Sequence, residues 1–210
     1  MEQLNQRLTM DSSASSAAAL PWLDIGQLTY SFVPDGTAFG SETSLLFSKL
    51  SASGSSAEWQ QAFDQAFHEW MTPLETTATR VEDSGLPFGS RGATQGDNRF
   101  GDIRIGAVPL SENVLAEAIP HAIITQGSWA GDILLNANAD WGSLDRVMSV
   151  ALHEIGHVLG LPHATDVNSP MNVASDSGSL APTPNDILQL KRLYAGIKVE
   201  SSDGHGGEMH

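Results

Sequence analysis

The chain has 210 residues, of which 40% are hydrophobic, and its 25 acidic and 10 basic side chains give a formal net charge of −15. This length suits one domain with a substantial buried core, and no apolar run approaches the roughly 18 residues of a membrane span. Because basic side chains are few, we expect no nucleic-acid partner and no membrane partner.

The two ends of the chain differ in composition from the part between them. Residues 1–19 are polar and then rich in serine and alanine, without the basic start and apolar stretch of a secretory signal. We expect a flexible leader at 1–19, one domain over 20–197, and a flexible glycine- and histidine-containing tail at 198–210.

The first half of the domain predicts two strands and one long helix. Residues 27–33 and 76–81, which are rich in β-branched, aromatic and apolar side chains, are the candidate strands. A capping box of Ser55 and Glu58 begins the helix. Helical spacing places a mostly aromatic stripe on one face, which we assign to the core: Trp59, Ala62, Phe63, Ala66, Phe67 and Trp70. The glycine-rich residues 82–101 then form a long loop, which is either a flap that shields a strand or a tolerated insertion.

The second half predicts three more strands and two helices. Strands are expected at 102–108 and 131–136, with a weaker one at 113–118. Residues 143–159 are apolar on most of their circumference, as a central buried helix requires. The last helix occupies 183–196, with a threonine cap, a proline at its first position and a glycine stop. Strands with helices packed on one side, followed by a mostly irregular C-terminal part, predict an α+β domain.

Residues 153–163, His-Glu-Ile-Gly-His-Val-Leu-Gly-Leu-Pro-His, have the spacing of a catalytic zinc site. His153 and His157 are four residues apart, so they share one face of a helix. Gly160 readily takes the left-handed conformation that ends a helix, and the turn brings His163 back as a third nitrogen ligand. Three ligands leave the fourth tetrahedral position open for water. The alternative is a half-buried polar helix face, but the added glycine and third histidine favour the metal site.

The motif and a later methionine together resemble a known clan. Met171 follows His163 in the sequence Ser-Pro-Met-Asn. The chain therefore resembles the metzincin zinc peptidases and, within them, the matrixins (matrix-metalloproteinase-like enzymes), over about residues 22–196. The resemblance implies an α+β catalytic domain with a twisted, mostly parallel five-stranded sheet, two long helices and an active-site cleft. It also implies an irregular C-terminal subdomain that contains the last helix.

The resemblance also implies a zinc-dependent endopeptidase acting on extended protein or peptide segments. Zinc lowers the pKa of water to about 7 in favourable sites. Glu154 then takes the proton of the attacking water and returns it to the departing amine. Met171 is expected to form an apolar floor beneath the histidines.

Substrate recognition is expected on both sides of the metal. Val114, Leu115 and Ala116 resemble the matrixin strand that pairs with an extended substrate, although an ordinary edge strand is the alternative. Val173 and Ser175 stand where matrixins have a Pro-x-Tyr wall lining the main specificity pocket. We therefore expect a pocket of different shape.

The resemblance extends to structural metals only in part. Asp102 and Asp132 match two carboxylates that hold a structural calcium in matrixins, with carbonyls of 128–130 as further ligands, although acids that merely flank strands are the alternative. Glu117 and Leu134 stand where animal matrixins have histidines for a second, structural zinc. We therefore expect one zinc per chain.

Two alternatives stay open. The chain is either an active peptidase or a weak or inactive zinc-holding domain that binds peptides, and retention of Glu154 favours the peptidase. Another metzincin branch is the second alternative, because Ala164 after the third histidine matches no usual branch marker. The family resemblance implies a secreted monomer. The sequence has no cysteine, so disulfides are excluded and the redox compartment cannot be read from it.

Overall fold

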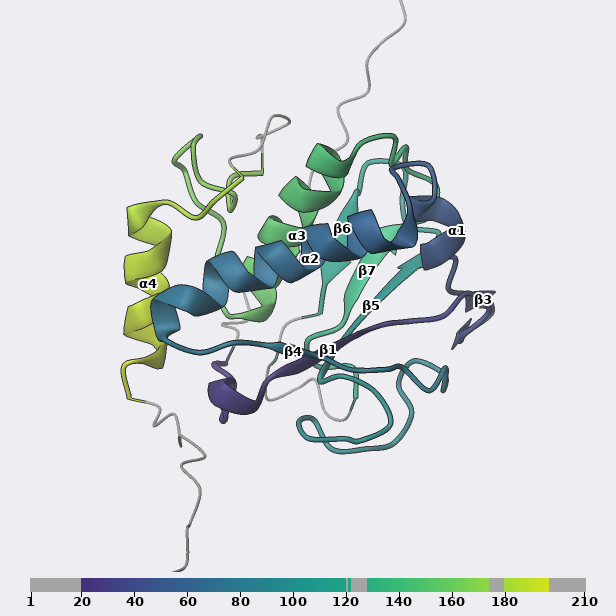
Figure 1. The fold of residues 1–210 in the computed structure, drawn as a ribbon, viewed down its shortest axis with the longest axis horizontal. Helices are drawn as coiled ribbons and strands as arrows, with labels where there is room; N and C mark the ends of the chain where they lie inside the picture. The colour runs from purple at the N-terminus through teal and green to yellow at the C-terminus, as the bar shows by residue number, and fades with distance from the viewer. Residues whose placement is uncertain (1–19, 120, 122–127, 174–179, 197–210) are drawn as a thin grey trace, which may run out of the picture.

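The computed structural model describes residues 20–119, 121, 128–173 and 180–196, and these form a sheet with two long helices across one face (Figure 1). The strands are β1 (Thr29–Phe32), β2 (Ala38–Phe39), β3 (Glu42–Thr43), β4 (Thr79–Arg80), β5 (Ile103–Val108), β6 (Ala116–Ala118) and β7 (Ile133–Asn136). The helices are α1 (Leu46–Leu50), α2 (Ser56–Met71), α3 (Leu144–Val158) and α4 (Pro184–Tyr194), with 3-10 turns at Ile25–Gln27 and Thr72–Leu74.

The main sheet has five strands in the order β4-β1-β5-β7-β6. β4, β1, β5 and β7 run parallel, and β6 lies antiparallel to β7 at one edge. All six residues of β5 are buried, as a central parallel strand covered on both faces requires. The predicted α+β fold with a mostly parallel five-stranded sheet is confirmed.

The aromatic stripe of α2 forms the core between the sheet and α3. Phe63 and Trp70 are fully buried, and Phe67 stacks on Tyr30 of β1 with ring centroids 4.0 Å apart. The indole Nε1 of Trp70 donates a hydrogen bond to the main-chain oxygen of Leu152 in α3 at 2.9 Å. This packing fixes α3, which carries the zinc motif, against the rest of the domain.

The opposite face of the sheet is covered by the loop 82–101. Arg104 of β5 points to this face and forms an ion pair with Asp83 at 2.8 Å, with both side chains fully buried. The guanidinium lies between the rings of Phe88 and Phe100, at 4.7 and 4.5 Å from their centroids. Residues at both ends of the loop are thus fastened to the middle strand of the sheet.

Most predicted elements are found within one to three residues of their expected bounds. The short elements α1 and the β2–β3 hairpin were not predicted, because two to five residues are too few to show a period. The expected leader and tail lie outside the described residues. Among the helices that are described, none has the length and apolar character needed to cross a membrane.

Candidate metal centre

Helix α3 begins after a serine cap and is followed by a glycine turn. The side chain of Ser143 accepts a hydrogen bond from Arg146 N at 3.2 Å, which caps the first turn. After Val158 the chain turns at Gly160, whose φ of 101° lies in the left-handed region, and Gly160 N donates to His157 O at 2.9 Å. The predicted glycine turn is therefore confirmed, and it reverses the chain toward the face of α3 that bears the histidines.

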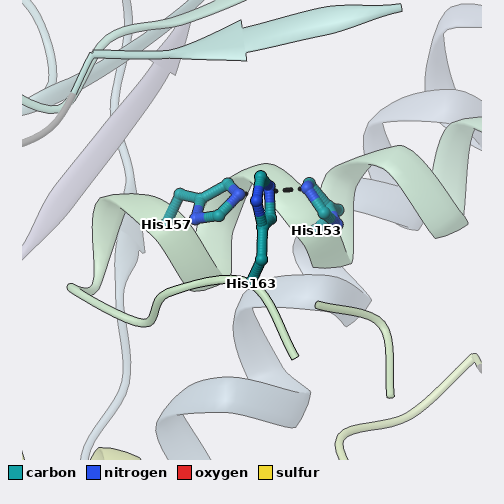
Figure 2. Close-up of side chains that lie close together, drawn as sticks. All are labelled: His153, His157 and His163. Carbon is teal, nitrogen blue, oxygen red and sulfur yellow. Dashed lines mark hydrogen bonds between the residues drawn. The ribbon is translucent and has the colours of Figure 1, made fainter. Parts of the chain in front are cut away.

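The turn brings His163 to the two histidines on α3. One ring nitrogen from each of His153, His157 and His163 lies within 4.8 Å of the others. Figure 2 shows the three rings gathered beside α3, with His163 reaching in from the loop that follows the helix. His153 and His157 are buried, whereas His163 is exposed. The site is thus anchored in the core on one side and open to solvent on the other.

The hydrogen bonds of the two helix histidines fix their tautomers. His153 Nδ1 lies 2.7 Å from Pro170 O, and His157 Nδ1 lies 2.8 Å from Leu161 O. A carbonyl oxygen can only accept, so each Nδ1 carries a proton and each neutral ring presents the lone pair of Nε2. The two Nε2 atoms are 3.0 Å apart. Two lone pairs facing each other at this distance repel, and a cation between them removes that repulsion.

The donor set and its spacing fit zinc. Two nitrogens bound tetrahedrally to one zinc ion at about 2.05 Å lie about 3.3 Å apart, which is close to the observed separation of 3.0 Å. Burial, reinforced by the neighbouring His157, lowers the pKa of His153 to about 3, so this ring is neutral at physiological pH. Three neutral imidazoles are a common ligand set of catalytic zinc, with room for a fourth ligand.

Met171 packs against α3 at Gly156, the residue before His157. It is 1% exposed, and a Cβ placed on Gly156 would lie 2.3 Å from the Met171 sulfur. The glycine therefore permits this close approach, and the apolar floor beneath the histidines stays a prediction. Glu154, one residue after His153, is fully buried.

The residues expected to recognise substrate lie in two places. Ala116 begins the edge strand β6, which contacts α3, and Leu115 and Val114 come directly before it. On the other side, Val173 is 38% exposed just after Met171. Ser175 lies outside the described residues.

The two predicted calcium ligands have different surroundings. Both oxygens of Asp102 accept hydrogen bonds, from Gly96 N at 2.6 Å and from the main-chain N and Oγ1 of Thr29 at 2.9 Å each. Asp132 is fully buried, and its Oδ1 accepts from Arg104 N at 3.1 Å, whereas Oδ2 has no hydrogen-bond partner among the described residues. Burial raises the pKa of both carboxyl groups. The histidine cluster is the one group of three or more metal-binding side chains in the described part, so a calcium site here stays a prediction.

The sequence did not reveal the carbonyl oxygens that orient the histidines. Pro170 O and Leu161 O are main-chain atoms, so no residue type marks them in a sequence. Their positions depend on the turns after α3, whose geometry a spacing pattern does not specify.

Comparison with known proteins finds a matching family and two relatives of the same kind. The sequence model of the family described as matrixin matches residues 42–195. A protein described as probable matrix metalloproteinase 095L, from Invertebrate iridescent virus 3, is 37% identical over 97 residues, which are 43% of this chain and 25% of that protein. Matrilysin from Felis catus is 32% identical over 83 residues, 36% of this chain and 32% of that protein. The matched part thus spans a third or less of these relatives.

Proposed function

Because the chain belongs to the matrixin family, we propose that it is a zinc-dependent endopeptidase whose metal ligands are His153, His157 and His163. Family membership supports a zinc metalloendopeptidase-like function. The observation that carries the assignment to these residues is the 3.0 Å approach of two Nε2 atoms whose Nδ1 protons are directed to carbonyl oxygens. When bound, zinc supplies Lewis acidity, which polarises a substrate carbonyl and makes water deprotonate near neutral pH.

Glu154 is the proposed general base. It follows His153 on α3 and is fully buried beside the histidine cluster. Its carboxylate takes a proton from the attacking water and later delivers that proton to the departing amine. Burial of Glu154 keeps bulk water away from its carboxylate, which strengthens the electrostatic interactions of the base.

The edge strand β6 is the proposed partner of an extended substrate. Leu115 and Ile119 hydrogen-bond toward β7, so alternation directs the main-chain groups of Ala116 and Ala118 to the other side of the strand. A peptide can add to such an edge by main-chain hydrogen bonds, which read backbone more than side chains. We therefore expect cleavage of flexible or unfolded segments, with Val173 contributing to side-chain preference.

A structural calcium ion at Asp102 and Asp132 is a further part of the proposal. The buried Oδ2 of Asp132 without a hydrogen-bond partner supports it, because a cation would compensate an ionised carboxylate in the protein interior. Asp102 already accepts three hydrogen bonds, but its two oxygens together offer about four acceptor sites. Secretion and a monomeric state are proposed from the family alone.

One experiment tests the function directly. The purified, zinc-loaded chain is incubated with a protein mixture, with and without a zinc chelator, and the new termini are sequenced. We expect internal cuts that the chelator abolishes and that zinc restores. Peptide binding without any cuts would instead support a zinc-holding binding domain and contradict the proposal. The same cut sites give the residue preference after the scissile bond, which reports on the pocket beside Val173.

A further inference from the structure

The residue after His163 is held at both of its main-chain polar groups by one turn, residues 169–172, which we call the Met171 turn. Ala164 N donates to Met171 O at 2.9 Å. Ala164 O accepts from the side-chain Nδ2 of Asn172 at 3.0 Å. Because peptide units are planar and rigid, fixing Ala164 on both sides also fixes the direction in which the chain leaves His163.

The same turn holds a second histidine and is itself anchored to α4. Pro170 O accepts the Nδ1 proton of His153 at 2.7 Å. Ser169 Oγ accepts from Met171 N at 3.0 Å and donates to the buried carboxylate of Asp186 in the first turn of α4, at 2.9 Å. The Met171 turn therefore contacts the proposed ligand set from two directions and is supported by a distant helix.

Of the three histidines, His163 is the one whose position depends most on Asn172, because it lies on a loop. The main-chain hydrogen bonds of α3 set the spacing of His153 and His157, and Pro170 O and Leu161 O orient their rings. His163 is exposed and lies on a loop, so its ring depends on loop geometry to meet the other two. Asn172 is 7% exposed, and its amide donates a side-chain hydrogen bond that ties this loop to the Met171 turn.

We propose that Asn172 is a positioning residue that holds His163 in place to complete the zinc site. This inference rests on the proposed zinc function. Partners that orient metal ligands typically change metal affinity by about 10- to 100-fold when removed. A bond that served only the fold would lower the stability of the metal-free protein and leave zinc affinity unchanged.

Two variants and a matched control separate these roles. Asn172→Leu replaces the amide with an apolar side chain of similar size. Asn172→Ser keeps a polar side chain that is too short to reach Ala164 O. Asn168→Ser is the control, because Asn168 lies exposed in the same loop. Among the described residues, its amide bonds to Asp166 at 3.1 Å, two residues away. Zinc dissociation constants are measured by chelator competition, visible spectra with cobalt in place of zinc, and melting temperatures without metal.

We expect both Asn172 variants to bind zinc about 10- to 100-fold more weakly and to shift the cobalt spectrum, with metal-free melting close to that of the parent. The Asn168 control should match the parent in all three measurements. If one Asn172 variant does not fold, the other decides. Zinc affinity equal to the parent in a folded variant overturns the proposal, as does failure of both variants to fold without metal. A parent chain that binds no zinc overturns this inference and the proposed function together.

Discussion

Removing one partner of the buried ion pair between Arg104 and Asp83 should strongly destabilise the domain. Arg104 donates to both carboxylate oxygens of Asp83, from Nε at 2.9 Å and from Nη2 at 2.8 Å. Arg104→Met keeps an unbranched apolar side chain between Phe88 and Phe100 but removes the charge. The carboxylate of Asp83 then stays buried with hydrogen bonds but without its counter-ion.

The magnitude follows from this burial. An exposed pair contributes about 0–1 kcal/mol. Both side chains here are fully buried, so removal of one partner leaves an uncompensated charge in the interior. Such a change costs about 3–5 kcal/mol, or about 6–20 °C in melting temperature for a domain of this size.

The assay is urea and thermal unfolding of the parent, Arg104→Met, Asp83→Asn and the double variant. We expect Arg104→Met alone to lose the most stability, and the double variant to lose less because no unpaired charge remains. A loss below about 1 kcal/mol in Arg104→Met would refute the reasoning, because it would match an exposed pair. A double variant no more stable than Arg104→Met would also contradict it.

Two further predictions concern the core and the buried carboxylate. Gly156→Ala should lower the free energy of unfolding by up to about 2 kcal/mol, because overpacking against Met171 and Trp70 outweighs a helix-propensity gain of about 1 kcal/mol. In a Met171→Ala background the same change should stabilise, and stabilisation in the parent, measured by urea unfolding, would contradict the packing. Without calcium, burial raises the pKa of Asp132 in the folded state above the value near 3.8 of the unfolded state. As the pH falls, the folded state therefore takes up this proton before the unfolded state does. The free energy of unfolding then rises as the pH falls from the raised pKa to about 3.8. Asp132→Asn should remove this part of the pH slope, and calcium should raise the melting temperature of the parent but not of the variant. Melts at several pH values that are alike for parent and variant, with calcium or chelator, would contradict both statements.

The zinc helix and its turn could be predicted because local rules determine them. Apolar side chains around 143–159 set a buried helix, the four-residue spacing of His153 and His157 sets a shared face, and Gly160 supplies the left-handed turn. The aromatic stripe of α2 follows from periodicity in the same way. These features depend on residues near one another in the chain.

Contacts between distant segments could not be predicted in this way. In the sequence, Arg104 is a charged residue within an otherwise apolar strand. The structure shows that Asp83, in the loop, neutralises this charge. The Met171 turn orients His153 through a main-chain oxygen, which has no signature in residue type. The link from Ser169 to Asp186 spans 17 residues and depends on how α4 packs.

The central claim is that Glu154 is the base of a zinc peptidase, and Glu154→Ala tests it most directly. The variant, the parent and an Asp145→Ala control at an exposed position of the same helix are loaded with zinc, and metal content and kcat/KM on one cleaved peptide are measured. The account predicts one zinc per chain in all three proteins and a loss of about 10²- to 10⁴-fold in kcat/KM for Glu154→Ala alone. Cleavage by zinc-loaded Glu154→Ala at the rate of the parent would contradict it.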